Sequence, residues 1–130
     1  MTRAWLVAAA VLLTAGIGEA HHSYADFLDQ TRSIGGILQT VKFANPHTVL
    51  TIRLSDGTVY KAVWAAGRQL DRQGVRRTAL QVGDNLLITG YPHKDPGRRE
   101  LSKLREVRRM ADGWTWRLVN GQVTITETTS

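Results

Sequence analysis

The pattern of apolar and polar residues beyond residue 20 predicts a chain built mainly of β-strands. Residues 34–54 combine Ile, Val, Leu, Phe and Thr with stretches of period-two alternation, which is typical of strands that bury one face. Pro46 interrupts this run, and proline cannot donate a hydrogen bond to a sheet ladder. We therefore expect two strand segments that meet in a bend at Asn45 and Pro46.

A hairpin turn and a third strand are predicted next. Residues 55–58 contain Asp-Gly, a pair that readily adopts the positive φ angles of tight turns. The apolar stretch 59–66 follows, and side chains alternate between the two faces of a strand. Tyr60, Ala62 and Trp64 should therefore share one face.

The chain then changes character, because residues 67–84 contain no β-branched run. We expect a short helix over about Arg68–Gln73 that is stopped by Gly74. Residues 85–92 include the Leu-Leu-Ile run of a buried strand, and residues 93–99 form a polar loop rich in turn-forming residues.

Residues 100–110 leave two interpretations open. Their apolar side chains recur at every third position, which suits a helix roughly but drifts around its surface. These residues are Leu101, Leu104, Val107 and Met110. A strand over the same residues would be poorly amphipathic.

The clearest alternation lies near the end of the chain. Residues 114–119 and 122–128 alternate in polarity, and the hairpin signals Asp-Gly and Asn-Gly precede them. The whole pattern predicts a mainly β architecture with one short helix between the third and fourth strands.

Residues 1–20 have the three parts of a secretory signal peptide. Arg3 is followed by an uncharged apolar run, and the small residues Gly18 and Ala20 occupy the positions that a signal peptidase inspects. A membrane anchor is the alternative, but a spanning helix needs about 20 apolar residues and this run is shorter. We expect cleavage after Ala20, which leaves one domain at residues 21–130.

The cysteine content and the net charge restrict the expected cellular location and binding partners of the protein. The chain has no cysteine, so disulfides and thiolate metal sites are excluded, and export without disulfides suits a bacterial periplasm or a secreted protein. The net charge is +6, but an exported protein rarely meets nucleic acid. We expect an anionic surface or an envelope protein as partner, although a solvated basic face is the plainer explanation. No later run is apolar enough to cross a membrane.

Several short motifs, taken in order, resemble one family. They are "HHSYADF", "ANPH", "VWAAG", "LQVGD" and "GYPHKD". The chain resembles an uncharacterised family of small exported bacterial proteins whose mature chain opens with His-His-Ser and later carries Asn-Pro-His and Gly-x-Pro-x-Lys-Asp. The resemblance runs from about His21 to Gly113. Two positions depart from it, since Val75 stands where Trp is common and Pro96 replaces a more flexible residue.

The resemblance implies a small closed β-barrel similar to an OB-fold, with the helix between strands three and four. It also implies that residues 100–110 form a strand, and we favour the strand for that reason. It implies no activity.

The residues themselves offer no catalytic constellation. The sequence has no Cys nucleophile, no Gly-x-Ser-x-Gly elbow, no phosphate-binding glycine loop and no His-Glu-x-x-His motif. We therefore expect a protein that binds a ligand and is not an enzyme.

Histidines are the concentrated chemical resource of this chain. Cleavage after Ala20 would give His21 an α-amine beside its imidazole, and His22 and His47 could add further nitrogens. Nitrogen-rich tetragonal sites suit Cu(II) best. Copper is therefore the candidate cofactor, although an exposed His-His start binds copper weakly in almost any peptide. For His47 we favour a residue at the barrel mouth whose imidazole satisfies a backbone group at the bend.

A second hypothesis is a binding module for glycans or anionic surfaces, since OB-like barrels bind ligands across one face and its loops. Trp64, Trp114 and Trp116 could stack on sugar rings, and Arg105 and Arg108 could meet acidic groups. Trp114 and Trp116 lie two positions apart and so share one face of a strand, and such a pair more often packs in a core. A structural accessory of an envelope complex is a third hypothesis, for which the sequence carries no separate signal.

Overall fold

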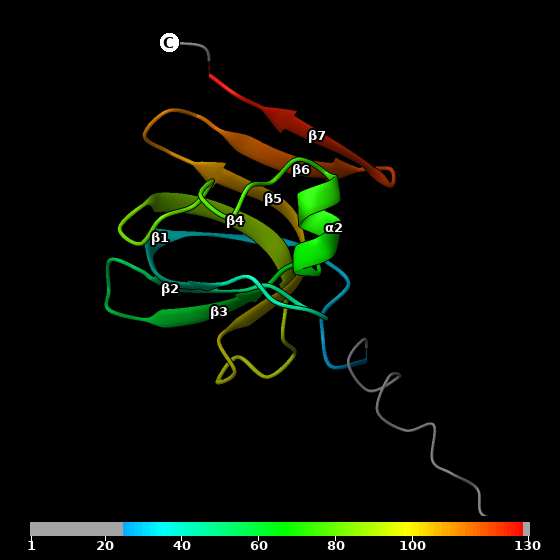
Figure 1. Ribbon diagram of the computed structural model, residues 1–130. Coiled ribbons are helices and arrows are strands. Elements are labelled where there is room, and N and C mark those ends of the chain that lie inside the picture. Colours follow the sequence, from blue (N-terminus) through cyan, green and yellow to red (C-terminus); the bar gives the residue numbers. More distant parts are fainter. Residues whose placement is uncertain (1–24, 129–130) are drawn as a thin grey trace, which may run out of the picture.

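The computed structural model describes residues 25–128, and seven strands there form one sheet with a single helix beside it (Figure 1). The elements are β1 (Arg32–Lys42), β2 (Val49–Arg53), β3 (Val59–Val63), α2 (Gly67–Arg72), β4 (Asn85–Pro92), β5 (Glu100–Arg109), β6 (Thr115–Val119) and β7 (Gln122–Thr126). The mainly β prediction is confirmed. The predicted signal peptide, His21 and His22 lie outside the described residues.

Five strands close into a barrel. Their order is β3-β2-β1-β4-β5, and β3 pairs with β5 in parallel through Lys61 opposite Glu100 and Ala62 opposite Leu101. All other neighbours are antiparallel. This closure and the position of α2 between β3 and β4 confirm the predicted OB-like barrel.

The β5 strand divides one of its edges between two partners. Its first residues, Glu100 and Leu101, pair with β3, whereas Glu106, Val107 and Arg108 pair with β6. The β6–β7 hairpin therefore continues the sheet beyond the barrel, and Figure 1 shows α2 beside this extension. Between Leu101 and Glu106, this edge of β5 pairs with neither β3 nor β6, so the sheet is interrupted there.

The bulge in β5 explains the period-three pattern that had suggested a helix. The segment of β5 from Ser102 to Glu106 contains more residues than the segment of β4 that it faces, from Thr89 to Tyr91. Lys103, within this segment of β5, has a φ of 47°. Extra residues in one strand bend it and re-aim its side chains. Three residues spaced by three therefore all face inward, namely Leu101, Leu104 and Val107.

The bend between β1 and β2 holds the beginning of α2. Gly67 N–H donates to the Ala44 carbonyl at 2.8 Å, and Arg68 N–H donates to Asn45 Oδ1 at 3.1 Å. The bend at Asn45 and Pro46 is thus confirmed, and its peptide bond is cis. The helix ends where the sequence indicated, since Gly74 has a φ of 94°.

The core is the barrel interior together with the layer under α2. Nine interior side chains are almost fully buried: Ile34, Leu38, Leu50, Ile52, Leu86, Ile88, Leu101, Leu104 and Val107. Leu70 of α2 and Leu80 of the following loop cover them from one end, with exposures of 0% and 2%. Between residues 25 and 128, no helix has the length and apolarity needed to cross a membrane.

Candidate functional site

A cavity of about 460 Å³ lies between the barrel and the β6–β7 hairpin. It opens where β5 changes partner from β3 to β6, so α2, β3, β5, β6 and β7 all contribute walls. Its lining consists of His47, Val63, Trp64, Ala65, Gln69, Gln73, Ser102, Lys103, Leu104, Arg105, Trp116, Leu118, Gly121 and Val123. Cavities of this size accommodate small ligands.

Two other hollows are somewhat larger, but they are more open grooves on the sheet. One, of about 530 Å³, runs over β6 and β7, and the other, of about 540 Å³, lies beside β1 and β2. Neither is lined by an indole or an imidazole. The cavity beside α2 therefore carries the more varied chemistry, and we take it as the candidate site.

Two buried indoles form the floor of this cavity. The rings of Trp64 and Trp116 meet edge to face, with centroids 5.2 Å apart and planes at 81°. Trp116 Nε1 donates to Gln73 Oε1 at 3.0 Å, and each indole is only 2% exposed. Edge-to-face pairs contribute beyond their buried area. The pair is therefore a fixed floor and offers no wide stacking platform.

The floor also holds an unsatisfied donor. Trp64 Nε1 is buried and has no hydrogen-bond partner in the described part of the chain, and Thr48 Oγ1 shares this condition. The two residues are joined through the main chain, because Trp64 N–H donates to the Thr48 carbonyl at 2.8 Å. Buried polar groups without partners are uncommon in native proteins. Trp64 Nε1 is therefore a donor that lies unsatisfied beneath an otherwise apolar floor.

Polar groups with a basic bias form the rim. His47 is exposed, and among the described residues no hydrogen bond to its imidazole is seen, so the bend is held by Asn45 and not by this ring. Arg105 donates from Nη2 to Tyr91 Oη at 3.2 Å, with its Cζ 5.5 Å from the Tyr91 ring centroid. No acidic side chain lines the cavity within residues 25–128, so the site favours anionic over cationic groups.

The structure brings some predicted site residues together and separates others. Four of them line the one cavity: His47, Trp64, Arg105 and Trp116. Trp114 also faces inward, but it packs under the guanidinium of Arg109, with Arg109 Cζ 5.5 Å from its ring. Arg108 lies on the outer face of the sheet, 2.7 Å from Glu106. In the part of the chain that the structure describes, no three His, Cys, Asp or Glu side chains gather as metal ligands would.

Sequence reasoning missed the amide groups of the site. Gln69 and Gln73 lie four positions apart, and this spacing puts both on one face of α2 and its C-cap, above the indoles. That spacing was visible in the sequence once the helix was predicted. Leu118 and Val123 could not be assigned to the site, because nothing in their own strands indicates which surface the hairpin covers.

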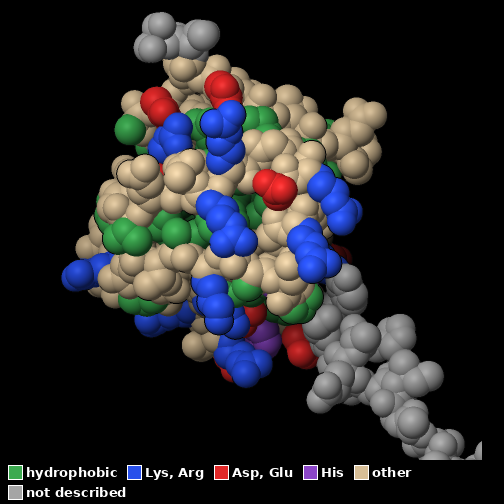
Figure 2. Space-filling view, in the orientation of Figure 1, with side chains coloured by type: hydrophobic (Ala, Val, Ile, Leu, Met, Phe, Trp, Pro, Cys, Tyr) green, Lys and Arg blue, Asp and Glu red, His purple; other side chains and the backbone are tan. Residues whose placement is uncertain are grey.

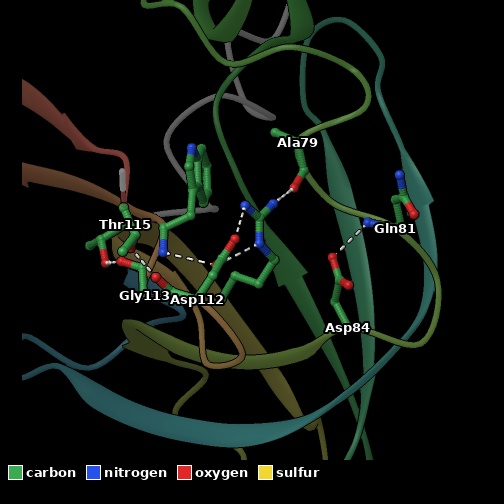
Figure 3. A network of polar contacts seen from close by, with 9 residues as sticks. Ala79, Gln81, Asp84, Asp112, Gly113 and Thr115 are labelled. Atoms are coloured by element: carbon green, nitrogen blue, oxygen red, sulfur yellow. Dashed lines mark hydrogen bonds and ion pairs between the residues drawn. The ribbon is translucent and has the colours of Figure 1, made fainter. Parts of the chain in front are cut away.

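A polar network around Asp112, at the turn between β5 and β6, holds Trp114 in place (Figure 3). Arg109 donates from Nε and Nη2 to the two carboxylate oxygens of Asp112 at 2.8 and 2.7 Å, and its Nη1 donates to the Ala79 carbonyl. Trp114 N–H also donates to Asp112 at 3.1 Å. The network ties this turn to the loop after α2, so Trp114 has a structural role here.

The ion pair between Arg109 and Asp112 should make the free energy of unfolding depend on pH in the acid range. The hydrogen bond from Arg109, followed by that from Trp114 N–H, lowers the pKa of Asp112 from 3.8 to about 2. Because the folded pKa is below the unfolded one, this stabilisation is complete above about pH 4 and is lost as the pH falls toward 2. The difference in unfolding free energy between wild type and Asp112→Asn should therefore shrink between pH 4 and pH 2 in urea titrations. When both proteins also carry Arg109→Gln, this difference in unfolding free energy should vary less with pH. An equally strong variation with pH would contradict Arg109 as the main cause of the lowered Asp112 pKa.

Comparison with known proteins gives a family and no activity. No curated protein matches the chain. The sequence model of a family of unknown function, DUF6152, matches residues 9–102. The matched stretch includes β1 to β4 and α2 and ends within β5 at Ser102, so the β6–β7 hairpin lies beyond it. Because the match covers well over half of its residues, the chain belongs to the DUF6152 family of proteins of unknown function.

Proposed function

We propose that this protein is an exported, non-catalytic binding protein that takes its ligand in the cavity between the barrel and the β6–β7 hairpin. The observation that carries the proposal is the gathering of two indoles, an imidazole and a guanidinium from separate segments around one space. Residues 1–20, with their signal-peptide pattern, support a periplasmic or secreted location.

The lining indicates a small ring-bearing ligand with a carboxylate group. The floor is apolar, formed by Trp64, Trp116 and Leu104, and it offers apolar contact, without a wide stacking surface, to the body of such a ligand. Arg105 at the rim has donors beyond the one used by Tyr91, and guanidinium groups bind carboxylates in a fixed planar geometry. Gln69 can supply hydrogen bonds to hydroxyl groups. Acidic monosaccharides and aromatic carboxylates share this chemistry.

The test is a binding panel read by tryptophan fluorescence, since the floor itself is the probe. Acidic monosaccharides and aromatic carboxylates should change the emission, and their amide derivatives should not. Arg105→Gln should weaken carboxylate binding by about tenfold or more, because a charge-assisted hydrogen bond contributes roughly 1.5–3 kcal/mol. Arg53→Gln, on the exposed side of β2, is the matched control and should bind as wild type. If the protein bound the carboxylates and their amide derivatives with equal affinity, the proposal would be wrong.

We also propose, as a second candidate function, a Cu(II) site formed at the mature amino terminus with help from His47. The specific observation in its favour is that the His47 imidazole is exposed and makes no hydrogen bond to a described residue. A neutral imidazole in that condition is available as a ligand, and the α-amine and imidazole of His21 would supply two more nitrogens. His22 could supply a fourth.

Copper titration of the processed protein tests this candidate. The amino-terminal site predicts a tight Cu(II) complex with a nitrogen-rich paramagnetic resonance spectrum. One extra residue before His21 should weaken binding and change the spectrum, and His47→Ala should change the spectrum alone. Identical affinity and spectra in all three proteins would exclude a specific site, leaving only the weak binding expected of any His-His peptide.

A further inference from the structure

Among the described strands, β7 has an edge that is open along its whole length. At the other end of the strand order, β3 pairs with β5 at Lys61 and Ala62, whereas β7 pairs only with β6 within residues 25–128. Open edges present unpaired N–H and C=O groups that can accept another strand. The edge of β7 is therefore the place where this sheet can be extended.

The register fixes which backbone groups face outward. Asn120 and Gly121 have φ angles of 50° and 74°, which is the conformation of a two-residue hairpin turn, and Val119 lies opposite Gln122 across it. Pairs in an antiparallel ladder alternate between hydrogen-bonded and non-hydrogen-bonded. Gln122, Thr124 and Thr126 therefore bond to β6, and the N–H and C=O groups of Val123 and Ile125 point to the open edge.

This edge lacks the features that usually block strand addition. Natural edges carry Lys, Pro or a bulge. The β7 sequence, Gln-Val-Thr-Ile-Thr, contains no charge and no proline, and its register with β6 is continuous. Its inward side chains, Val123 and Ile125, pack against the core, so the strand is held in place and its edge is preformed.

The outer face beside this edge is basic. A groove of about 530 Å³ runs over it and is lined by hydroxyl and guanidinium groups, from Thr115, Thr124, Thr126, Arg108 and Arg117. Glu106 is the acidic partner of both arginines, at 2.7 Å from Arg108 and 3.2 Å from Arg117. One carboxylate therefore serves two guanidinium groups. Figure 2, which looks at the side of the molecule where α2 lies, shows Lys and Arg side chains scattered there among uncharged surface and a few acidic groups.

We propose that β7 binds an extended acidic segment of a partner protein, which adds to the sheet as an eighth strand. Its backbone would pair with Val123 and Ile125, and alternate acidic side chains would lie on the face of Thr124. Arg117 would turn from Glu106, on the β5 side, toward the new strand. Neighbouring strands are about 4.8 Å apart, so an extended Arg side chain can span the intervening threonine.

A second copy of this chain fits the edge less well. Two β7 strands paired antiparallel would be related by a two-fold axis perpendicular to the sheet, which places both arginine-bearing faces on the same side. Each copy also carries a net charge of +6. Charge complementarity therefore favours an acidic partner.

The test uses the whole mature protein and two synthetic peptides of alternating sequence, Glu-Val and Lys-Val, at low ionic strength. The Glu-Val peptide should bind and protect the amides of Val123 and Ile125 from hydrogen exchange, whereas the amide of Thr124 should already be protected. Arg117→Glu should weaken binding by roughly two- to fivefold, the range expected for exposed charge pairs. Arg53→Glu is the control of equal charge and should bind as wild type. Arg105→Gln should also bind normally, which separates this edge from the cavity.

Three results would overturn the proposal. Equal weakening by Arg117→Glu and Arg53→Glu would mean that only net charge matters. Peptide binding without new protection at Val123 and Ile125 would place the peptide elsewhere. Protection that rises with protein concentration in the absence of peptide would show that a second copy occupies the edge.

Discussion

Replacing Gly36 with Ala should destabilise the protein by about 3 kcal/mol, the upper end of the usual range for overpacking. A Cβ at this position would lie 2.3 Å from the Arg53 carbonyl oxygen and 2.8 Å from its carbon. Both are backbone atoms of β2, the strand paired with β1, so no side chain can rotate away. The strands would have to separate at this point of the barrel wall.

Gly35 provides the matched control for that change. Its Cβ would meet nothing closer than 3.9 Å, and neither glycine has a positive φ. Gly35→Ala should therefore change stability by less than about 1 kcal/mol, and the loss of chain entropy in the unfolded state can make it slightly stabilising. Thermal melts separate the two, because each kcal/mol shifts Tm by about 4–8 °C in a domain of this size. Equal Tm values for the two variants would contradict the packing described here.

Trp116→Ala should cost about 3–5 kcal/mol, the range found when a buried Trp or Phe is truncated. The indole is 2% exposed and joins the β6 strand to Trp64 and to α2. Its removal would enlarge the cavity and leave Gln73 without its donor. Urea unfolding followed by far-UV circular dichroism measures the loss.

Trp116→Phe separates packing from hydrogen bonding in this effect. The ring remains against Trp64, but the bond to Gln73 Oε1 is lost, so we expect a cost of about 1–2 kcal/mol. In the double variant Trp116→Phe with Gln73→Leu the acceptor is also removed, and part of the stability should return. A Trp116→Ala variant as stable as wild type would show that the hairpin does not pack on the helix.

Local patterns predicted most of the barrel. The turn at Asp56 and Gly57, the stop at Gly74 and the strand at 85–92 follow from residue types acting over a few positions, and the structure has all three. The segment 100–110 was ambiguous for a physical reason. Its period of three arises from the bulge around Lys103, and a bulge depends on the partner strand, which no local window contains.

The candidate site was predictable in its members but not in its assembly. Trp64, Trp116, Arg105 and His47 are each recognisable as chemically capable residues, yet they come from four separate segments. Their meeting depends on β5 giving one half of an edge to β3 and the other half to β6. Trp114 was a candidate site residue by the same reasoning, but it lies outside the cavity lining and packs under Arg109 in a structural network.

The divided edge of β5 also bears on the order of folding. The β6–β7 hairpin joins residues close in sequence, whereas barrel closure must bring Lys61 to Glu100 across the helix, β4 and the three connections between them. Contacts between distant residues carry the larger loop-closure entropy and form more slowly. The hairpin can therefore be complete while the barrel is still open, and Trp116 meets Trp64 only at closure. Fluorescence of that indole pair would then report the last step of folding.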